Sequence, residues 1–387
     1  MSEPKRHAIA AGNVFDGWTR HKDAAVVVEG SLIVGVVPQS ELPLDLEVRK
    51  LPSEVWLAPG FIDLQVNGGG DVLFNNSPTP EAIRAIAVAH RKFGTTALLP
   101  TFITDTSEKM TAAFAAAESL AESEPGILGI HLEGPFLSSE KTGVHDANLM
   151  RQPSPADLKM LCGPRKGALL VTLAPERVPN GFIARLVQSG VRVSLGHSMA
   201  TYDETLAAMA EGLSGFTHLF NAMRPLASRE PGPIAAALES PKAWFGMIVD
   251  GFHVNPAMLR LALRGLGQPI LVTDAMPPVG GRQSKFDLYG SEIQVIGGRC
   301  ARSDGTLAGS ALDMAAAVRN CVHMLRVPLD DALRFASRNP AAFIGLGHLL
   351  GGLHPGYRAD VVALDAGTFD VLGTWVAGKE SPEMSRS

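Results

Sequence analysis

The sequence GILGIHLEGP, residues 126–135, combines the two features on which the fold depends. Residues 126–132 are almost wholly apolar, which is typical of a parallel strand buried on both faces. The end of this run carries His131 and Glu133 and is followed by a Gly-Pro pair, so ionisable side chains stand where the strand stops. The same order, an apolar run and then a polar end, recurs along the chain and predicts a parallel sheet.

Eight such apolar runs are present: residues 57–64, 96–102, 126–132, 169–173, 191–195, 213–219, 244–249 and 269–272. Amphipathic stretches long enough for crossover helices lie between them, at residues 80–93, 108–122, 179–190 and 202–211. Successive runs are about 30 residues apart, which is the size of a βαβ unit. We therefore predict an α/β protein with a (β/α)8 TIM-like barrel over residues 56–349.

Short β segments flank the predicted barrel at both ends of the chain. Residues 24–28 and 33–37 are β-branched runs near the start, and residues 360–364 and 371–376 form a similar tail. Neither pair could bury a core alone, so we expect the two to associate. We predict a small β-sandwich domain made of residues 1–55 plus 350–387.

The region after the eighth run departs from a simple repeat. Residues 286–302 are punctuated by glycine and have strand character, which predicts a hairpin insertion. Residues 329–337 and 339–346 then predict helices before the tail begins.

Charge and composition exclude several classes of function. The 34 basic and 39 acidic side chains give a net charge of -5 without any Lys/Arg block, which offers no footprint for nucleic acid or an anionic membrane. The start of the chain, residues 1–7, is polar and leads into no apolar segment, and no run approaches the roughly 20 residues of a membrane span. We expect a cytoplasmic protein. Three cysteines without CxxC spacing predict free thiols.

Polar side chains at the strand ends indicate where the chemistry lies. In such barrels the active site is built at the carboxyl ends of the strands, which the fold brings to one mouth. The residues at or just after the predicted strand ends are Asp63, Gln65, Asn67, His131, Glu133, His197, His218, Asp250, His253 and Asp274.

Glu133, His197 and His218 have the composition of a catalytic zinc site, which uses three nitrogen or oxygen ligands and leaves a position for water. Such a metal lowers the pKa of bound water toward about 7. Asp274 could accept the proton of that water and pass it to a leaving group. A single histidine at a strand end is more often structural than a ligand. Two histidines, a glutamate and an aspartate, each after a different strand, favour the metal site.

Several strings in the sequence resemble the N-acetylglucosamine-6-phosphate deacetylases of the amidohydrolase superfamily. They are PGFID (59–63), HLEGPF (131–136), LGHS (195–198), THLFNAM (217–223), REPG (229–232), DGFH (250–253) and VTDA (272–275). The first string is widespread in the superfamily, whereas HLEGPF and HLFNAM together are specific to these deacetylases. The resemblance covers nearly the whole chain.

The resemblance implies hydrolysis of the acetamide of N-acetylglucosamine 6-phosphate to glucosamine 6-phosphate and acetate. We expect one divalent metal ion per subunit, zinc in the first place, while Fe, Co and Mn also accept such ligands. It implies Glu133, His197 and His218 as metal ligands, Asp274 as proton acceptor and donor, and His145 as the group that polarises the amide carbonyl. It assigns substrate binding to Val144, Asn221, Ala222, Arg229, Asp250, Gly251, Phe252, His253, Leu307, Ala308 and Gly309.

The resemblance also implies a homodimer in which Arg229 and His253 act, at least in part, on the substrate of the neighbouring subunit. The planar fork of an arginine suits a phosphate group because it donates paired hydrogen bonds. The alternative role for Arg229 is that of a surface arginine before Pro231.

The first strand departs from the wider superfamily. Many relatives carry His-x-His there and bind a second metal, but this chain has Gln65 and Asn67, neutral amides that ligate such cations poorly. We therefore predict one tightly bound metal. The alternative role for both amides is to form hydrogen bonds that orient other residues, which is compatible with a single ion.

Three competing functions remain open at this stage. The same chemistry could act on the galactosamine epimer, because loop geometry sets which hydroxyl orientation is accepted. Another amidohydrolase reaction, such as hydrolysis of a cyclic amide, is disfavoured by the missing second-metal ligands. A catalytically silent scaffold is disfavoured because it has no need of Glu133, His197, His218 and Asp274 together.

Overall fold

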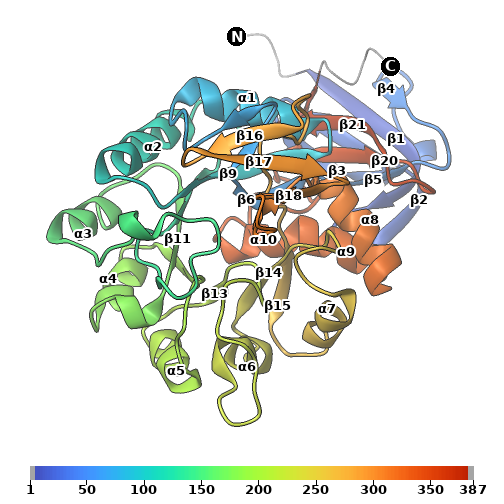
Figure 1. The fold of residues 1–387 in the computed structure, drawn as a ribbon. Coiled ribbons are helices and arrows are strands. Elements are labelled where there is room, and N and C mark those ends of the chain that lie inside the picture. Colours follow the sequence, from blue (N-terminus) through green and yellow to red (C-terminus); the bar gives the residue numbers. More distant parts are fainter. Residues whose placement is uncertain (1–4, 382–387) are drawn as a thin grey trace. The chain divides into compact units, whose positions relative to one another are not determined.

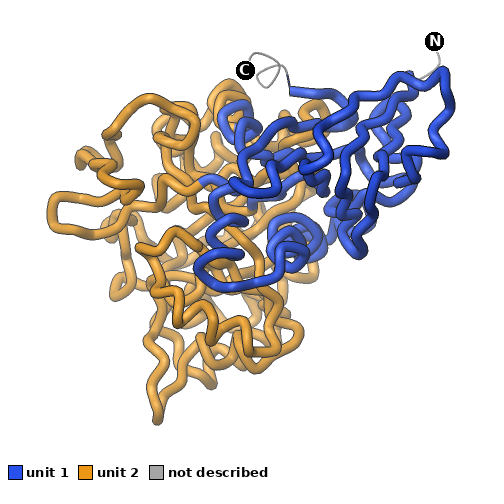
Figure 2. The backbone as a smooth tube through the Cα atoms, turned by 90° about the vertical axis from the view of Figure 1, so that its right-hand side faces the viewer, with its two compact units in different colours: residues 1–63, 87–97, 313–387 blue, residues 64–86, 98–312 orange. Residues whose placement is uncertain are grey.

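The computed structural model describes residues 5–381; residues 1–4 and 382–387, with part of the polar start and of the predicted terminal domain, lie outside the description. The chain forms two compact units, one of residues 1–63, 87–97 and 313–387, the other of residues 64–86 and 98–312 (Figure 2). The domain boundaries drawn from the sequence, after residues 55 and 349, stay predictions.

An eight-stranded sheet of parallel strands forms the barrel (Figure 1). Its order is β15-β14-β13-β12-β11-β10-β9-β6. The strands are β6 (Phe61–Val66), β9 (Thr95–Ile103), β10 (Gly129–Glu133), β11 (Ala168–Leu173), β12 (Arg192–Leu195), β13 (Gly215–Phe216), β14 (Trp244–Met247) and β15 (Gln268–Leu271). A parallel bridge between Val66 and Ala275 joins the first strand to the segment after the last. This bridge brings the first and last strand ends to one mouth.

One apolar run divides between two sheets. The stretch 57–64, predicted as one strand, forms β5 (Trp56–Pro59) and β6 on either side of Gly60. A side chain at Gly60 would collide with that of Thr96, so the close approach requires glycine there. Only the second half of the run belongs to the barrel.

Helices connect the barrel strands. They are α1 (Pro80–Arg91), α2 (Ser107–Leu120), α3 (Pro155–Leu161), α4 (Phe182–Gln188), α5 (Tyr202–Ala210), α6 (Gly232–Glu239) and α7 (Pro256–Ala262). The helices predicted from the sequence, α1, α2, α4 and α5, are confirmed, whereas α3, α6 and α7 were not predicted. The short α3 begins at a capping box in which Ser154 and Asp157 satisfy each other's backbone N–H groups. Figure 1 shows α2 to α7 around the outside of the strands.

The insertion after β15 is larger than the predicted hairpin. It is an antiparallel sheet of β16 (Lys285–Leu288), β17 (Ser291–Ile296), β18 (Arg299–Ala301) and β19 (Leu307–Ser310), called here the inserted sheet. Its buried side chains pack with residues that follow barrel strands, such as Val144 and Met276. Two very short strands, β7 (Gly68–Gly69) and β8 (Val72–Leu73), pair after β6.

A separate sheet contains strands from both ends of the chain. Its order is β22-β21-β20-β5-β1-β2-β3, with β4 also paired to β1. Besides β5, the strands are β1 (Arg6–Phe15), β2 (Arg20–Glu29), β3 (Leu32–Pro38), β4 (Glu47–Lys50), β20 (Val361–Leu364), β21 (Val371–Val376) and β22 (Lys379–Glu380). The tail joins the sheet through the antiparallel pair of β20 and β5. The predicted fold class, a barrel with a separate β structure built from both termini, is confirmed.

Three helices precede the tail: α8 (Met314–Leu325), α9 (Leu329–Ala336) and α10 (Arg338–Phe343). The last two confirm the helices predicted from the sequence. Among residues 5–381, no helix combines the length and apolar character needed to span a bilayer. The cysteines are free as predicted, with Cys300 and Cys321 buried and Cys162 only half-buried.

Candidate functional site

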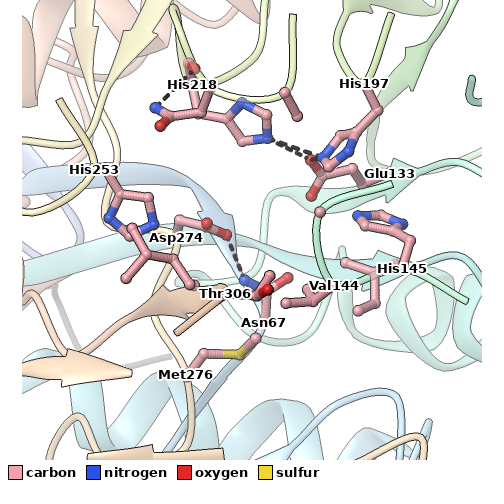
Figure 3. A pocket seen from close by; sticks show the side chains of 16 residues that line it. Asn67, Glu133, Val144, His145, His197, His218, His253, Asp274, Met276 and Thr306 are labelled. Carbon is pink, nitrogen blue, oxygen red and sulfur yellow. Dashed lines mark hydrogen bonds and ion pairs between the residues drawn. The ribbon is translucent and has the colours of Figure 1, made fainter. Parts of the chain in front are cut away.

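Glu133, His197 and His218, called here the Glu-His-His cluster, lie together at the barrel mouth (Figure 3). Their potential ligand atoms all lie within 4.8 Å of one another. Glu133 Oε1 is 3.0 Å from His218 Nε2 and 3.2 Å from His197 Nε2, and the two imidazole nitrogens are 3.2 Å apart. All three side chains are buried. Residues separated by up to 85 positions therefore form one compact donor set.

The orientation of these side chains suits a cation. The carbonyl of Lys141 accepts a hydrogen bond from His197 Nδ1 at 2.7 Å, so the lone pair of Nε2 faces the cluster. Gln65 Nε2 donates to Glu133 Oε2 at 3.2 Å, which leaves Oε1 directed at the two imidazoles. Two nitrogens and one carboxylate oxygen suit zinc and related divalent ions. The cluster could therefore hold a metal ion.

The electrostatics of the cluster keep its carboxyl group ionised. Burial raises the pKa of Glu133, but its interactions with the imidazoles of His197 and His218 outweigh burial and hold that pKa well below its usual value. Burial lowers the pKa of His218, and here too the hydrogen bond and negative charge of Glu133 outweigh burial, so the pKa is raised. A carboxylate is the form in which glutamate binds a metal.

The backbone turns sharply where the strands deliver these residues. His197, His218 and Asp274 have positive φ angles of 49°, 33° and 52°. Residues other than glycine rarely adopt this region, and such conformations concentrate at functional sites. The strand ends bend at the three positions whose side chains enter the site.

Asp274 lies in the same pocket, bonded to both amides of the first strand. Asn67 Nδ2 donates to Asp274 Oδ1 at 2.7 Å, and Gln65 Nε2 donates to the same oxygen at 3.2 Å. Burial and the nearby negative charge of Glu133 raise the pKa of Asp274 to about 6. The two amides form orienting hydrogen bonds of the kind given above as their alternative role: Gln65 donates to Glu133 and Asp274, and Asn67 donates to Asp274.

His145 stands beside the cluster. Its ring centroid is 4.3 Å from that of His197, and its Nδ1 is 2.8 Å from the hydroxyl oxygen of Thr104. Burial, followed by the charge of His197, lowers the pKa of His145 well below its usual value. A neutral imidazole is therefore present next to the potential metal position.

A cavity of about 280 Å³ contains these groups. It is small, as suits a single sugar-sized ligand. The predicted site residues that line it are Glu133, Val144, His145, His197, His218, Asn221, Ala222, His253, Asp274, Leu307 and Gly309. Most of the site predicted from the sequence is thus brought together by the fold.

Five predicted substrate residues do not line the cavity: Arg229, Asp250, Gly251, Phe252 and Ala308. Arg229 is exposed, and the Phe252 side chain is 48% exposed. Asp250 lies next to His253, whose Nδ1 is 2.6 Å from Asp250 Oδ2. Ala308 is wholly buried in the core of the inserted sheet. Asp250 therefore supports a lining residue rather than facing the cavity itself.

Other lining residues were not predicted to bind substrate: Asn67, Ile103, Gly143, Met276 and Thr306. A Cβ atom at Gly143 would lie 3.2 Å from His197 Cε1, and its φ angle is 55°, so glycine allows the loop to approach the cluster. Gly143 directly precedes Val144, which was predicted to bind substrate, so the sequence does contain a signal for Gly143. Thr306 and Met276 likewise stand one and two positions from residues already singled out.

A barrel with two histidines, a glutamate and an aspartate at its mouth defines a class of metal-dependent hydrolases. Comparison with known proteins agrees, since residues 56–381 match the Amidohydrolase family, and the chain belongs to this family.

Within the family the chain is similar to deacetylases of phosphorylated amino sugars. It is 45% identical to the N-acetylgalactosamine-6-phosphate deacetylase of Shewanella sp. (strain ANA-3), over 92% of this chain and 91% of the relative. It is 36% identical to the N-acetylglucosamine-6-phosphate deacetylase of Haemophilus influenzae, over 97% and 99%. The crystal structure of N-acetylglucosamine-6-phosphate deacetylase from Pasteurella multocida matches with a TM-score of 0.93 at 37% identity, covering 97% and 99% of the two chains.

Proposed function

We propose that this chain hydrolyses the acetamide of N-acetylglucosamine 6-phosphate to glucosamine 6-phosphate and acetate, as a step of amino-sugar catabolism. The observation that carries the proposal is the buried Glu-His-His cluster in one small cavity with Asp274. The substrate follows from the similarity to the relatives named above. Acetate release from the phosphorylated sugar by the purified protein tests the proposal directly, and no release with the metal supplied would contradict it.

Glu133, His197 and His218 would hold one divalent ion, zinc in this proposal. When bound, such an ion lowers the pKa of a water molecule toward about 7 and polarises a carbonyl group. The remaining steps fall to side chains of the chain itself. Metal analysis of the purified protein identifies the ion.

Asp274 would move the proton. Its Oδ1 atom is occupied by the donors Asn67 and Gln65, which leaves Oδ2 for proton exchange. The carboxylate takes a proton from the attacking water and passes it to the amide nitrogen as the carbon–nitrogen bond breaks. The nitrogen leaves as an amine and the acyl group as acetate, so one water is consumed for each bond broken.

His145 would stabilise the oxygen on which negative charge develops. In this proposal the Thr104 hydroxyl, 2.8 Å from Nδ1, donates to that nitrogen, and the proton of the neutral ring lies on Nε2. An N–H group fixed in a buried site lowers the energy of a developing oxyanion without reorganisation. The low pKa of the ring keeps it neutral at the pH of the reaction.

The sugar phosphate would be held by Asn221, Ala222 and His253 in the cavity. His253 is fixed by Asp250 through Nδ1, which leaves Nε2 for the ligand. Arg229 lies exposed outside the cavity lining of its own chain. We therefore assign it to the phosphate of a neighbouring subunit in a homodimer, whereas His253 serves the cavity of its own chain.

A second candidate function is deacetylation of the galactosamine epimer. The 45% identical relative from Shewanella carries that name and favours this candidate. Values of kcat/KM on the two epimers decide between them: a ratio above about tenfold for the gluco sugar supports the first proposal, and the reverse supports the second. Full activity on the unphosphorylated sugar would contradict both.

A cytoplasmic location completes the proposal. Its support is the charged phosphate group of the proposed substrate, which does not cross a lipid bilayer unaided. Fractionation of cells that express the full chain tests it, with the activity expected in the cytoplasmic fraction.

A further inference from the structure

Asn67 presents a buried oxygen to the cavity without a hydrogen-bond partner. The residue is 1% exposed and lines the cavity, and among residues 5–381 none donates to its Oδ1 atom. A buried acceptor left unpaired costs free energy, so most such atoms in proteins have a partner. The cavity is where a partner of Asn67 can enter.

The orientation of the Asn67 amide is fixed by its neighbour. The amide atom 2.7 Å from Asp274 Oδ1 must be a donor when that carboxylate is ionised, so it is Nδ2 (Figure 3). The other amide atom is then the carbonyl oxygen. Asn67 is therefore able to accept one hydrogen bond from a ligand while it continues to donate to Asp274.

We propose that Asn67 Oδ1 accepts a hydrogen bond from the N–H group of the amide that is cleaved, which makes Asn67 a catalytic residue and a selector for amides. The inference deepens the proposed function and rests on it. The substrate nitrogen has to approach Asp274, because that carboxyl group gives it a proton. Asn67 is bonded to the same carboxyl group, so the N–H of the amide is the substrate donor that comes nearest to Oδ1.

The hydrogen bond strengthens as the reaction proceeds. Protonation by Asp274 places positive charge on the nitrogen while the carbon–nitrogen bond breaks, and an N–H group of a positive nitrogen is a better donor. A contact that is stronger in the transition state than in the bound substrate accelerates the chemical step. Asn67 would thus hold the leaving nitrogen on one side while Asp274 protonates it.

The contact predicts discrimination between an amide and an ester. The test substrate is the 2-O-acetyl ester of glucose 6-phosphate, assayed freshly prepared by initial rates, in which oxygen replaces the N–H group. Both substrates need the metal ligands, so a defect in the metal site lowers kcat/KM for both. The amide nitrogen needs protonation more than the ester oxygen does, so a control variant must measure how far a disturbed Asp274 alone changes the ratio of the two values.

The variant Asn67→Ala removes the acceptor and should lower the amide-to-ester ratio of kcat/KM by about tenfold, the worth of one buried hydrogen bond to a group gaining charge. Asn67→Asp has nearly the same volume and keeps an acceptor; it should slow both substrates and leave the ratio unchanged. If Asn67→Ala fails to fold, Asn67→Asp still tests the inference. A tenfold fall in the amide-to-ester ratio of Asn67→Asp would contradict it.

Gln65→Ala is the matched control, because Gln65 donates to the same Asp274 oxygen but does not line the cavity. It should lower both activities and change their ratio by much less than Asn67→Ala does. An unchanged ratio in Asn67→Ala, or an equal fall in Gln65→Ala, overturns the inference while the proposed function stands. Wild-type protein that hydrolyses neither substrate overturns the proposed function and this inference with it.

Discussion

In the proposed reaction Asp274 serves both as a base for water and as an acid for the leaving nitrogen. In the variant Asp274→Asn the amide keeps the size of the side chain but exchanges no proton, so turnover should fall by about 10³-fold or more. Metal content should remain that of the wild type, because Asp274 is not part of the Glu-His-His cluster. Initial rates and metal analysis of the same preparation check both statements.

A matched control for that variant is Asp313→Asn. Asp313 is a half-buried aspartate that caps the start of α8, a position in which asparagine serves equally well. Its turnover should match the wild type. Normal turnover in Asp274→Asn would remove that residue from the proposed chemistry.

The pH dependence follows from the raised pKa of Asp274. The carboxyl group must be ionised to accept a proton, so kcat/KM should fall about tenfold per pH unit on the acid side of its pKa. That pKa is about 6, raised by burial and by Glu133. A bound cation adds positive charge nearby, which favours the carboxylate and moves the midpoint below 6. A midpoint at or above 7 would contradict the assignment of the acid limb to Asp274.

In the proposed function Asp250 acts on the substrate through His253. Its carboxylate accepts hydrogen bonds from the backbone N–H of Phe252 and of His253 and lies 2.6 Å from the imidazole. We expect Asp250→Asn to raise KM by about tenfold with a smaller change in kcat, because loss of a charged hydrogen bond lets the ring reorient. A double-mutant cycle with His253→Ala should show strong non-additivity. Additive effects would indicate that Asp250 contacts the substrate independently.

At the scale of elements, the inserted sheet is joined to a barrel strand end at Asp274. The N–H group of Ser310 in β19 donates to the carbonyl of Asp274 at 2.9 Å. The approach is close: a Cβ atom at Gly309 would lie 2.7 Å from that carbonyl oxygen, and Gly309 has a φ angle of 57°. The position of Asp274 therefore depends on a glycine in another sheet.

The variant Gly309→Ala tests this dependence. The added methyl group must displace β19 or Asp274, so we expect a loss of about 1–3 kcal/mol in the free energy of unfolding and a fall in kcat. Gly290→Ala is the control, since Gly290 has a φ angle of 73° in the same sheet but open space around it. Gly290→Ala should lower the free energy of unfolding through backbone strain alone and leave kcat unchanged. Denaturant titration and initial rates measure both, and equal kcat values for the two variants would contradict the expectation.

What the sequence predicted about these elements has a physical basis. An apolar run marks a strand buried on both faces, and the polar residue that ends it must reach the mouth of the barrel, which is why Glu133, His197, His218 and Asp274 could be identified together. α4 also has only seven residues, but it was predicted because it lies within the longer amphipathic stretch of residues 179–190. Helices α3 and α7, of seven residues each, had no such stretch predicted around them. They could be found only by their caps.

Two residues that line the cavity, Thr306 and Asn67, were harder to predict from the sequence. Thr306 belongs to a turn before β19, where no hydrophobic period exists, and its place at the cavity depends on the pairing of strands in the inserted sheet. The role of Asn67 depends on which amide atom faces Asp274, and sequence cannot specify that. The spacing of apolar runs in the sequence locates the strand ends. Only the hydrogen-bond geometry of the structure shows which donor or acceptor atom each side chain presents to the cavity.

At the scale of the whole molecule, the bound metal should contribute to stability as well as to activity. A ligand that binds only the folded state raises the free energy of unfolding by an amount that grows with its concentration over Kd. Chelation should therefore abolish turnover and lower Tm, and one equivalent of zinc per chain should restore both. Full activity of verified metal-free protein would contradict the proposed chemistry, and two tightly bound equivalents would contradict the single site.

The homodimer proposal makes a prediction that needs both subunits. Arg229→Ala loses the phosphate contact but keeps Asp274, and Asp274→Asn loses the proton carrier but keeps Arg229. If Arg229 serves the neighbouring subunit, a mixed dimer of the two variants contains one site with both residues intact and one site with neither. Random reassortment makes about half of the dimers mixed, so the mixture should recover about a quarter of the wild-type activity. Dimers of either variant alone provide the baseline, and their mass in solution confirms the assembly. If instead the arginine acts on the cavity of its own chain, each site of the mixed dimer lacks one residue and the mixture stays at the baseline.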